Sequence, residues 1–356
     1  MGKIVHENYI TIAKALGIIL MVIGHSGCPL LLYKFIYLFH MPLFFLCSGI
    51  FYRPILNKSD ACLYLKKKVA GLYVPFVKWS LLFLAFHNTF LMVGIYNPIY
   101  GYEGGTSAYT IGDILNRLGL ILLSMRGYEE LLGGFWFIRS LFVSTILITL
   151  VSLLLGNRVR FKHESMCMLF LLLTILIRRS MPDIELGREL AMGTMGATFF
   201  MMGKILVPNI HWLKTMHGAI LCGLVLLLSM IYFKDVVKME CGFNKVIPYS
   251  IAAISGSLLT LYLSDKINNN LCVVRRILYY VGNHTLTILA LHFICFRLVS
   301  FVIVMIYNLD SAYIAQHPVI QNMTLWGSSC WWLVYSIVGI SVPLLLNFLL
   351  KRIVTK

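Results

Sequence analysis

The chain has 356 residues, of which 59% are hydrophobic and only 12% are charged. Soluble domains are nearer half apolar and a quarter charged, so this composition excludes a water-soluble globule, a disordered tail and a secreted disulfide scaffold. Its 30 basic residues outnumber the 14 acidic ones and give a net charge of +16, an excess that the basic cytoplasmic loops of a membrane protein supply.

A membrane-spanning helix needs roughly 20 mostly apolar residues. We find ten such runs and therefore predict an all-α integral membrane protein with about ten transmembrane helices. The fifth run is short, and the ninth is long enough to tilt or break. The runs cover residues 9–28, 33–52, 69–93, 135–155, 165–177, 190–207, 215–233, 246–264, 277–307 and 329–350.

The connections between the runs are short, so we expect residues 1–356 to form a single transmembrane domain with no appended soluble domain. The longest connection covers residues 94–134 and is predicted to lie outside. Within it, residues 111–125 are predicted to form an amphipathic helix at the membrane interface.

The placement of Lys and Arg predicts that both termini are cytoplasmic. With the N-terminus inside, the inner connections carry seventeen basic and four acidic groups, a net charge of +13. The outer connections carry nine basic and ten acidic groups, a net charge of −1. This bias is the established signal for orientation, with the basic side in the cytoplasm.

The first run places a cation and an imidazole on one helix face. Lys14 and His25 are eleven residues apart, which brings the second side chain to within about 20° of the first at a rise of about 16 Å. Small residues beside them, Ala13, Gly17 and Gly24, leave room for a neighbour or a ligand. Acyl-coenzyme A fits this spacing, because it has an anionic head and a long, narrow arm. As the alternative, Lys14 snorkels to the lipid headgroups.

The second run combines His40 with a proline. Pro42 cannot donate a hydrogen bond to Leu38 and therefore disturbs the helix beside His40. Imidazole exchanges protons near neutral pH, so His40, His25 and His292 in the ninth run are candidates for acid–base chemistry. For His40 or His292 taken singly, the alternative is a hydrogen bond between helices.

Three consecutive lysines, Lys66, Lys67 and Lys68, precede the third run at its cytoplasmic end. Such a cluster attracts anions. One interpretation is a docking patch for the phosphates of coenzyme A. The alternative is ordinary anchoring to acidic lipid headgroups.

Four basic residues fall well inside predicted spans: Lys14, Lys78, Arg139 and Arg297. Lys34 and Lys204 lie close to the ends of their runs and are counted with the connections. A charge at the centre of a spanning helix costs roughly 2.5–3.5 kcal/mol, so such residues normally have a partner or face a cavity. None of the acidic residues falls within a predicted span. We therefore expect a bound anion to supply the counter-charge. For Arg139, as for Lys14, the alternative is that the long side chain snorkels, so that its charged end reaches the lipid headgroups.

These residues together resemble the acyltransferase 3 family of polytopic membrane acyltransferases. The family's first span carries a basic residue, ten intervening residues and a histidine, as Lys14 and His25 do here. The resemblance covers about residues 8–350. Its other motifs are FHMPLFFLCSG with His40, Pro42, Ser48 and Gly49, the inner segment LKKKVAGLYVPF, Phe135-Trp136-Phe137, and Gly282-Asn283-His284-Thr285-Leu286 leading to His292.

The resemblance implies a multi-pass acyltransferase of the inner (plasma) membrane, typically bacterial. It implies an acetyl or other acyl group drawn from cytoplasmic acyl-CoA and moved to a hydroxyl of a cell-envelope or exported glycan, with no metal and no nucleic acid involved. On this hypothesis His25 is the general base, and the acyl-CoA contacts come from Lys14, Lys66, Lys67, Lys68, Trp136 and Arg139.

The oxyanion of the reaction then needs a donor or cation, for which Arg139, Trp136 and His40 are candidates. His292 and Arg297 are further candidates without an assigned role. Because His25 lies near the outer end of its run, we expect the acceptor to arrive from outside or from the outer leaflet, and a cytoplasmic acceptor is the alternative.

A transporter or flippase for an anionic or lipid-linked sugar is the competing class, with the intramembrane cations as its binding site. Two features disfavour it. Transporters of this kind often show internal repeats, and we find none in the sequence. Sites for coupling ions usually need intramembrane acids, and the predicted spans contain none.

Overall fold

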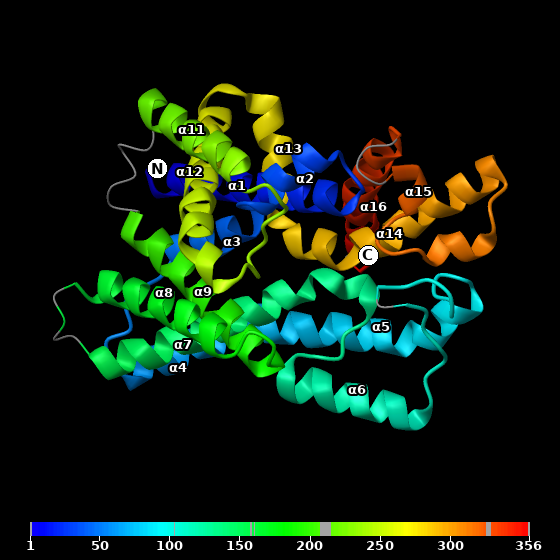
Figure 1. Cartoon of the computed structure of the whole chain (residues 1–356), viewed down its shortest axis with the longest axis horizontal. Coiled ribbons are helices and arrows are strands. Elements are labelled where there is room, and N and C mark those ends of the chain that lie inside the picture. Colours follow the sequence, from blue (N-terminus) through cyan, green and yellow to red (C-terminus); the bar gives the residue numbers. More distant parts are fainter. Residues whose placement is uncertain are drawn as a thin grey trace. The chain divides into compact units, whose positions relative to one another are not determined.

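The computed structural model describes residues 2–102, 104–156, 159, 161–206, 215–324 and 329–354. Helices make up most of this part of the chain, which contains no strand, and the predicted all-α fold is confirmed. The longer helices are α1 (Gly2–His25), α2 (Leu30–Tyr37), α3 (His40–Ile50), α4 (Lys58–Lys68), α5 (Val74–Met92), α6 (Ile111–Ser124), α7 (Trp136–Leu155), α8 (Lys162–Ser180), α9 (Glu185–Leu206), α11 (Met216–Tyr232), α12 (Val246–Asn270), α13 (Cys272–Asn283), α14 (Thr285–Tyr307) and α16 (Trp331–Val354) (Figure 1).

Short helical turns connect several of them: η1 (Val69–Tyr73), η2 (Glu130–Phe135), η4 (Phe243–Lys245), η5 (Ser311–Ala315) and α15 (Gln321–Thr324). The predicted helix at residues 111–125 is α6. Its N-terminus carries a capping box, in which the Thr110 hydroxyl accepts from the Asp113 N–H and the Asp113 carboxylate accepts from the Thr110 N–H.

Seven helical stretches among the described residues are long and apolar enough to cross a membrane: Asn8–His25, Leu30–Ile50, Lys58–Met92, Glu130–Leu155, Phe243–Asn270, Thr285–Tyr307 and Trp331–Arg352. α11 is apolar but shorter. The fifth and sixth predicted runs correspond to α8 and α9, and Val207 at the end of the sixth lies outside the described residues. The structure supports a multi-pass membrane protein, whereas the count of ten spans and the cytoplasmic termini stay predictions.

Two of the predicted runs are broken by identifiable residues. The second run ends as α2 at Tyr37 and restarts as α3 at His40, because Pro42 cannot continue the hydrogen bonding of α2 but fits the first turn of a new helix. The ninth run breaks between α13 and α14. There the Asn283 side chain donates to the Tyr279 carbonyl at 2.9 Å and so competes with the backbone pattern.

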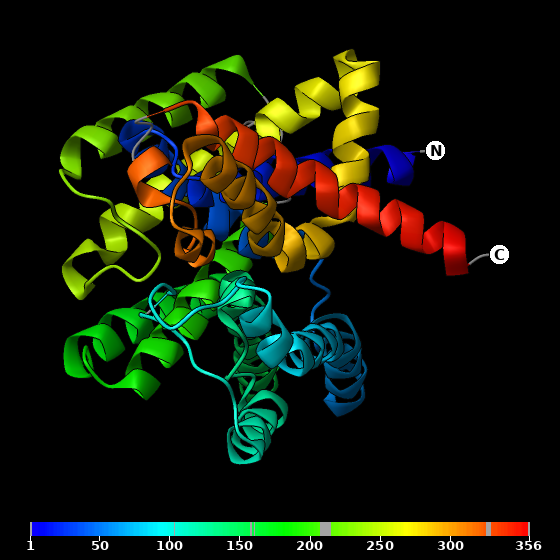
Figure 2. The same ribbon diagram turned by 90° about the vertical axis from the view of Figure 1, so that its right-hand side faces the viewer.

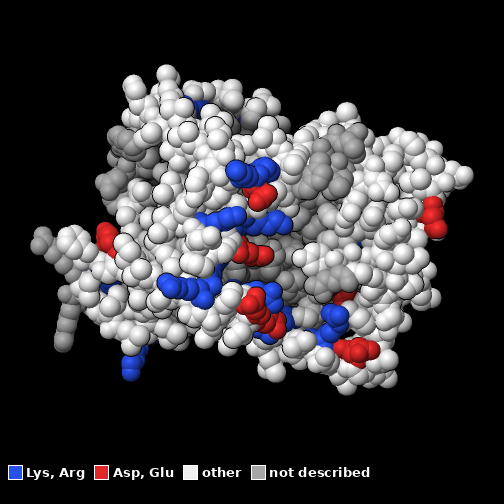
Figure 3. All heavy atoms as spheres, viewed as in Figure 1, with Lys and Arg blue, Asp and Glu red and all other residues white. Residues whose placement is uncertain are grey.

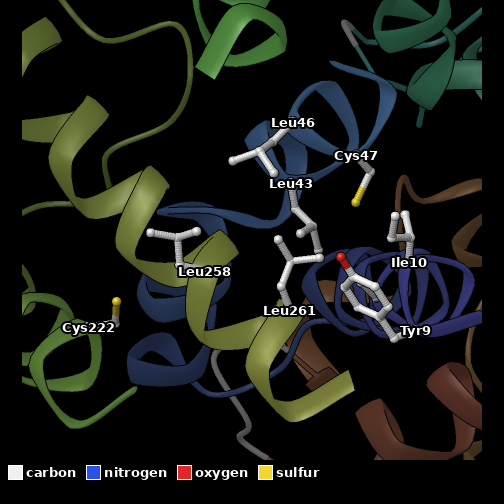
Figure 4. Close-up of a cluster of buried hydrophobic side chains, with 9 residues drawn as sticks. Tyr9, Ile10, Leu43, Leu46, Cys47, Cys222, Leu258 and Leu261 are labelled. Atoms are coloured by element: carbon white, nitrogen blue, oxygen red, sulfur yellow. The ribbon is translucent and has the colours of Figure 1, made fainter. Parts of the chain in front are cut away.

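The described helices form two compact units. The first unit comprises Met1–Gly17, Lys34–Leu72 and Phe137–Asn283. In it, α3 packs against α9 and α12, α8 against α9, and α11 against α12. Its core is a cluster of buried side chains that α1, α3, α11 and α12 contribute (Figure 4): Tyr9, Ile10, Ala13, Leu43, Leu46, Cys47, Cys222, Leu258 and Leu261.

The second unit comprises Ile18–Tyr33, Tyr73–Trp136 and His284–Lys356. α14 is its central helix: it packs against α16, η2 and η5, and Figure 2 shows α14 and α16 (orange and red) next to each other. α5 packs against α6. The C-terminal end of α1, which carries His25, belongs to this unit, so the second unit holds the principal candidate residue.

Candidate active site

His25 is the last residue of α1, and the residues after it explain why the helix ends there. The N–H and the hydroxyl of Ser26 both donate to the Ile23 carbonyl oxygen in the last turn of the helix. Gly27 follows with φ of +79°, a left-handed conformation that glycine adopts without strain and that commonly ends helices. Pro29 cannot continue the helix. The sequence His25-Ser26-Gly27-Cys28-Pro29 therefore leaves a half-buried imidazole at the carbonyl end of α1.

Two residues of α14 lie directly beside His25. The centroid of the His25 ring is 5.5 Å from that of His292 and 5.0 Å from that of Phe293. α14 buries His292, Phe293, Phe296, Arg297 and Ser300, whose spacing places them on one helix face. The structure thus brings together two of the three histidines that the sequence singles out.

The protonation state of His292 follows from its contacts. Its side chain is fully buried, and its Nδ1 lies 3.1 Å from the Ile288 carbonyl oxygen and 3.0 Å from that of Leu289. Carbonyl oxygens only accept, so Nδ1 carries the hydrogen and Nε2 of the neutral ring keeps a lone pair. Nε2 has no hydrogen-bond partner among the described residues. His292 therefore offers an acceptor next to His25.

Arg297 lies one turn further along α14 and is 3% exposed. Its guanidinium donates to the Gln316 carbonyl oxygen at 2.5 Å and to the Glu130 carboxylate at 3.5 Å. Glu130 also accepts from the Tyr102 N–H at 2.9 Å. The expectation that Arg297 has no acidic partner is wrong, because Glu130, which hydropathy assigns to a loop, folds back onto α14.

The expectation that an intramembrane cation lacks an acidic partner is also wrong for Arg139, in the first unit. This residue of α7 is half-buried and forms an ion pair with Glu189 of α9. Glu189 lies just before the predicted sixth run, which is why the sequence places it outside the membrane. On the face in Figure 3, several Lys and Arg side chains likewise lie next to Asp and Glu. Two of the four predicted intramembrane cations therefore already have a counter-charge.

The other two predicted intramembrane cations differ in exposure. Lys14 is half-buried on α1, in the same unbroken helix as His25, whereas Lys78 is exposed on α5.

The three lysines Lys66, Lys67 and Lys68 form the last turn of α4. Lys66 and Lys67 are exposed there, and the Lys68 ammonium lies over the rings of Tyr64 and Phe200, at 5.2 and 5.7 Å from their centroids.

His40 belongs to the first unit and is 2% exposed. Its Nδ1 lies 2.8 Å from the Ile36 carbonyl oxygen, and its ring contacts that of Tyr37. The break between α2 and α3, which Pro42 predicts, leaves this imidazole at the first position of α3. Trp136 is a half-buried residue of the second unit at the start of α7.

Sequence reasoning missed His317, which lies in the segment between η5 and α15. It is 8% exposed, and the centroid of its ring is 4.6 Å from that of Phe293. Phe293 therefore contacts three imidazoles, those of His25, His292 and His317. No hydrophobic period or motif marks His317, since it lies in a predicted outer connection.

A second missed feature is the buried pair of His87 on α5 and Glu129. His87 Nδ1 lies 2.7 Å from the Glu129 carboxylate, and Nε2 lies 3.0 Å from the Ser107 carbonyl oxygen. The Tyr109 ring stacks on the imidazole at a centroid distance of 3.3 Å. Because the carbonyl only accepts, Nε2 carries a hydrogen. The pair and its contacts with Ser107 and Tyr109 hold the connection between α5 and α7 against α5.

His317 gives the second unit a predicted dependence on acid. Burial is the main cause that lowers the pKa of His317 to about 3, and the charge of Arg297 acts in the same direction. The unfolded chain, with an ordinary pKa of about 6.5, binds more protons between these two values. Stability should thus be fully present above pH 6.5 and fall below it, by up to about 1.4 kcal/mol per pH unit from this group.

This acid dependence can be measured as the melting temperature of the detergent-solubilised protein between pH 7.5 and pH 5. A His317→Gln variant should lose less stability than the wild type over this interval. Equal losses in both proteins would contradict the prediction.

Comparison with known proteins identifies the family of the chain. The profile of the acyltransferase 3 family, described as an acyltransferase domain, matches residues 7–348, nearly the whole chain. No curated protein and no solved structure matched the chain. The matched region includes α1 with Lys14 and His25, and α14 with His292 and Arg297. The chain therefore belongs to the acyltransferase 3 family.

Proposed function

We propose that this protein is a membrane O-acetyltransferase, which moves an acetyl or other acyl group from cytoplasmic acyl-CoA to a hydroxyl of a cell-envelope or exported glycan. The observation that carries the proposal is the family match over residues 7–348. The position of His25, at the end of α1 and in contact with His292 and Phe293, supports a reaction centre there.

In the proposed reaction, His25 takes the proton of the acceptor hydroxyl as the hydroxyl oxygen attacks the thioester carbonyl. The C–O bond forms, the C–S bond breaks, and coenzyme A leaves as the thiolate. Imidazole suits this step because it accepts a proton near neutral pH. The carbonyl end of α1, where His25 lies, carries partial negative charge and favours the imidazolium that forms.

Lys14, Lys66, Lys67 and Lys68 are the groups that we assign to acyl-CoA. Exposed Lys66 and Lys67 are available to the phosphates of the donor. Arg139 is a weaker candidate than the sequence indicates, because an anion would have to displace Glu189 from it. We also assign Trp136 to the acyl-CoA donor. Trp136 and His40 are the candidates for the group that stabilises the oxyanion.

The structure weakens the main argument for a transporter. That argument uses intramembrane cations that lack acidic partners, and both Arg139 and Arg297 are paired with glutamates. No further observation favours a transport function.

The test uses the purified protein in lipid vesicles with acetyl-CoA that is labelled in the acetyl group. Membranes that contain the glycans of a strain lacking this protein serve as the acceptor. We expect label in the glycan fraction and release of free coenzyme A in equal amounts. Label that stays in acetyl-CoA would contradict an acetyltransferase.

A further inference from the structure

We propose that His317 is a further substrate-positioning residue beside His25, which binds a hydroxyl of the polyhydroxylated acceptor, and that the Arg297–Glu130 ion pair holds His317 in place. The proposal rests on the proposed function of His25. It adds to that function a residue of the outer segment 308–320 that would recognise the acceptor rather than the acyl donor.

Phe293 provides the geometric link between His25 and His317. Its ring centroid is 5.0 Å from that of His25 and 4.6 Å from that of His317. All three residues belong to the second unit, so these distances lie within one compact body. The two distances add to 9.6 Å, so the ring centroids of His25 and His317 lie no further apart than this. A sugar that offers one hydroxyl to each imidazole, from different positions of its ring, can span such a separation.

Unsatisfied buried nitrogens indicate a missing ligand. His317 Nδ1 and His292 Nε2 are both buried without a hydrogen-bond partner among the described residues. A buried polar atom without a partner costs about 1–3 kcal/mol, so its occurrence calls for an explanation. A neutral imidazole has one donor and one acceptor nitrogen, and a hydroxyl group can satisfy either of them. A polyol is therefore the chemical class that fits.

Arg297 fixes the segment that carries His317. It donates to the carbonyl oxygen of Gln316, the residue immediately before His317, at 2.5 Å. Its acidic partner Glu130 accepts from the Tyr102 N–H, and the Tyr102 ring makes an edge contact with the His317 ring at 5.6 Å. The ion pair thus holds the segment both before and beside His317. Arg297 acts through His317 and is a positioning residue.

The experiment is a mutant cycle in the labelled transfer assay, with the acceptor membranes and acetyl-CoA varied separately. The variants are His317→Ala, the pair Arg297→Gln with Glu130→Gln, and all three changes together. Removing both charges of the ion pair leaves neither charge buried alone. His217→Ala, at an exposed histidine of the first unit, is the matched control.

We expect His317→Ala to raise the apparent KM for acceptor membranes about tenfold and to leave the KM for acetyl-CoA within about twofold of wild type. The charge-neutral pair should raise the acceptor KM in the same way. The triple variant should be no worse than His317→Ala, because changes that act through one group are not additive. A merely structural role would change both KM values or lower the amount of folded protein without this selectivity.

Two outcomes would overturn the proposal: an acceptor KM of His317→Ala equal to that of wild type, or a triple variant whose losses multiply. Should the charge-neutral pair fail to fold, Arg297→Lys replaces it, since lysine keeps the charge but not both contacts; a wild-type acceptor KM in Arg297→Lys would then contradict the positioning role. Failure of the proposed function itself is separate, because it appears as absent transfer by the wild type.

Discussion

Replacement of His25 by alanine is expected to lower the rate of acetyl transfer about 10²–10⁴-fold, the usual contribution of a positioned general base. The expectation follows from the place of His25 at the end of α1, where its ring contacts His292 and Phe293. The measurement is the initial rate of label transfer from acetyl-CoA to acceptor membranes, with wild type and variant at equal amounts of folded protein.

The control for His25→Ala is His217→Ala, which removes an exposed imidazole from α11 and should leave the rate unchanged. The KM for acetyl-CoA should change little in His25→Ala, because the proposed donor contacts come from the lysines. If His25→Ala transfers label at the wild-type rate, His25 is not the base. If it instead loses only affinity for acetyl-CoA, His25 is a binding residue.

The helices and the family motifs could be predicted from the sequence because both are local features. Apolar runs of about 20 residues mark most of the helices, and Pro42 marks the break before α3. The end of α1 is equally local, since Gly27 and Pro29 follow His25 directly. The match over residues 7–348 confirms the family that these motifs indicate.

The partners of the buried cations could not be predicted in this way. Glu130 lies 167 positions from Arg297 in the sequence, and Glu189 lies 50 positions from Arg139. Glu130 is the first residue of η2, and Glu189 lies near the start of α9, but both precede the predicted apolar runs and hydropathy therefore places them in loops. Whether such a residue turns back to pair with a buried cation depends on tertiary packing, which a hydropathy pattern does not contain.

His317 shows the same limit for the site. An imidazole in an outer connection is unremarkable by sequence, and its significance comes from Phe293 and Arg297, which lie on another element. His292 is a candidate by motif, but only the structure shows its fixed Nδ1 hydrogen and its place next to His25. The sequence thus indicates the residue types of the site, and packing decides which of them meet.

Substitution of Gly49 by valine is expected to separate α3 from α9 and to destabilise the first unit. A Cβ at Gly49 would lie 1.7 Å from the Phe200 carbonyl oxygen of α9, and a Cβ at Gly203 of α9 would lie 2.1 Å from the Leu46 carbonyl oxygen of α3. The two glycines therefore let the backbones approach from both sides, the usual function of small residues between membrane helices. The neighbouring atoms belong to backbone and cannot rotate away, as a flexible side chain can.

The expected loss for Gly49→Val is about 3 kcal/mol, at the upper end of what overpacking usually costs. Gly223→Ala is the matched control, because nothing lies within 4 Å of a Cβ at this position of α11. There alanine should leave the melting temperature unchanged or raise it, since it favours a helix over glycine by about 1 kcal/mol. Melting temperatures in detergent, measured together with the fraction of monodisperse protein, compare the variants. A Gly49→Val protein as stable as Gly223→Ala would show that α3 and α9 do not pack with their backbones in contact, and Gly203→Val, which tests the same contact from the other helix, should then be tolerated as well.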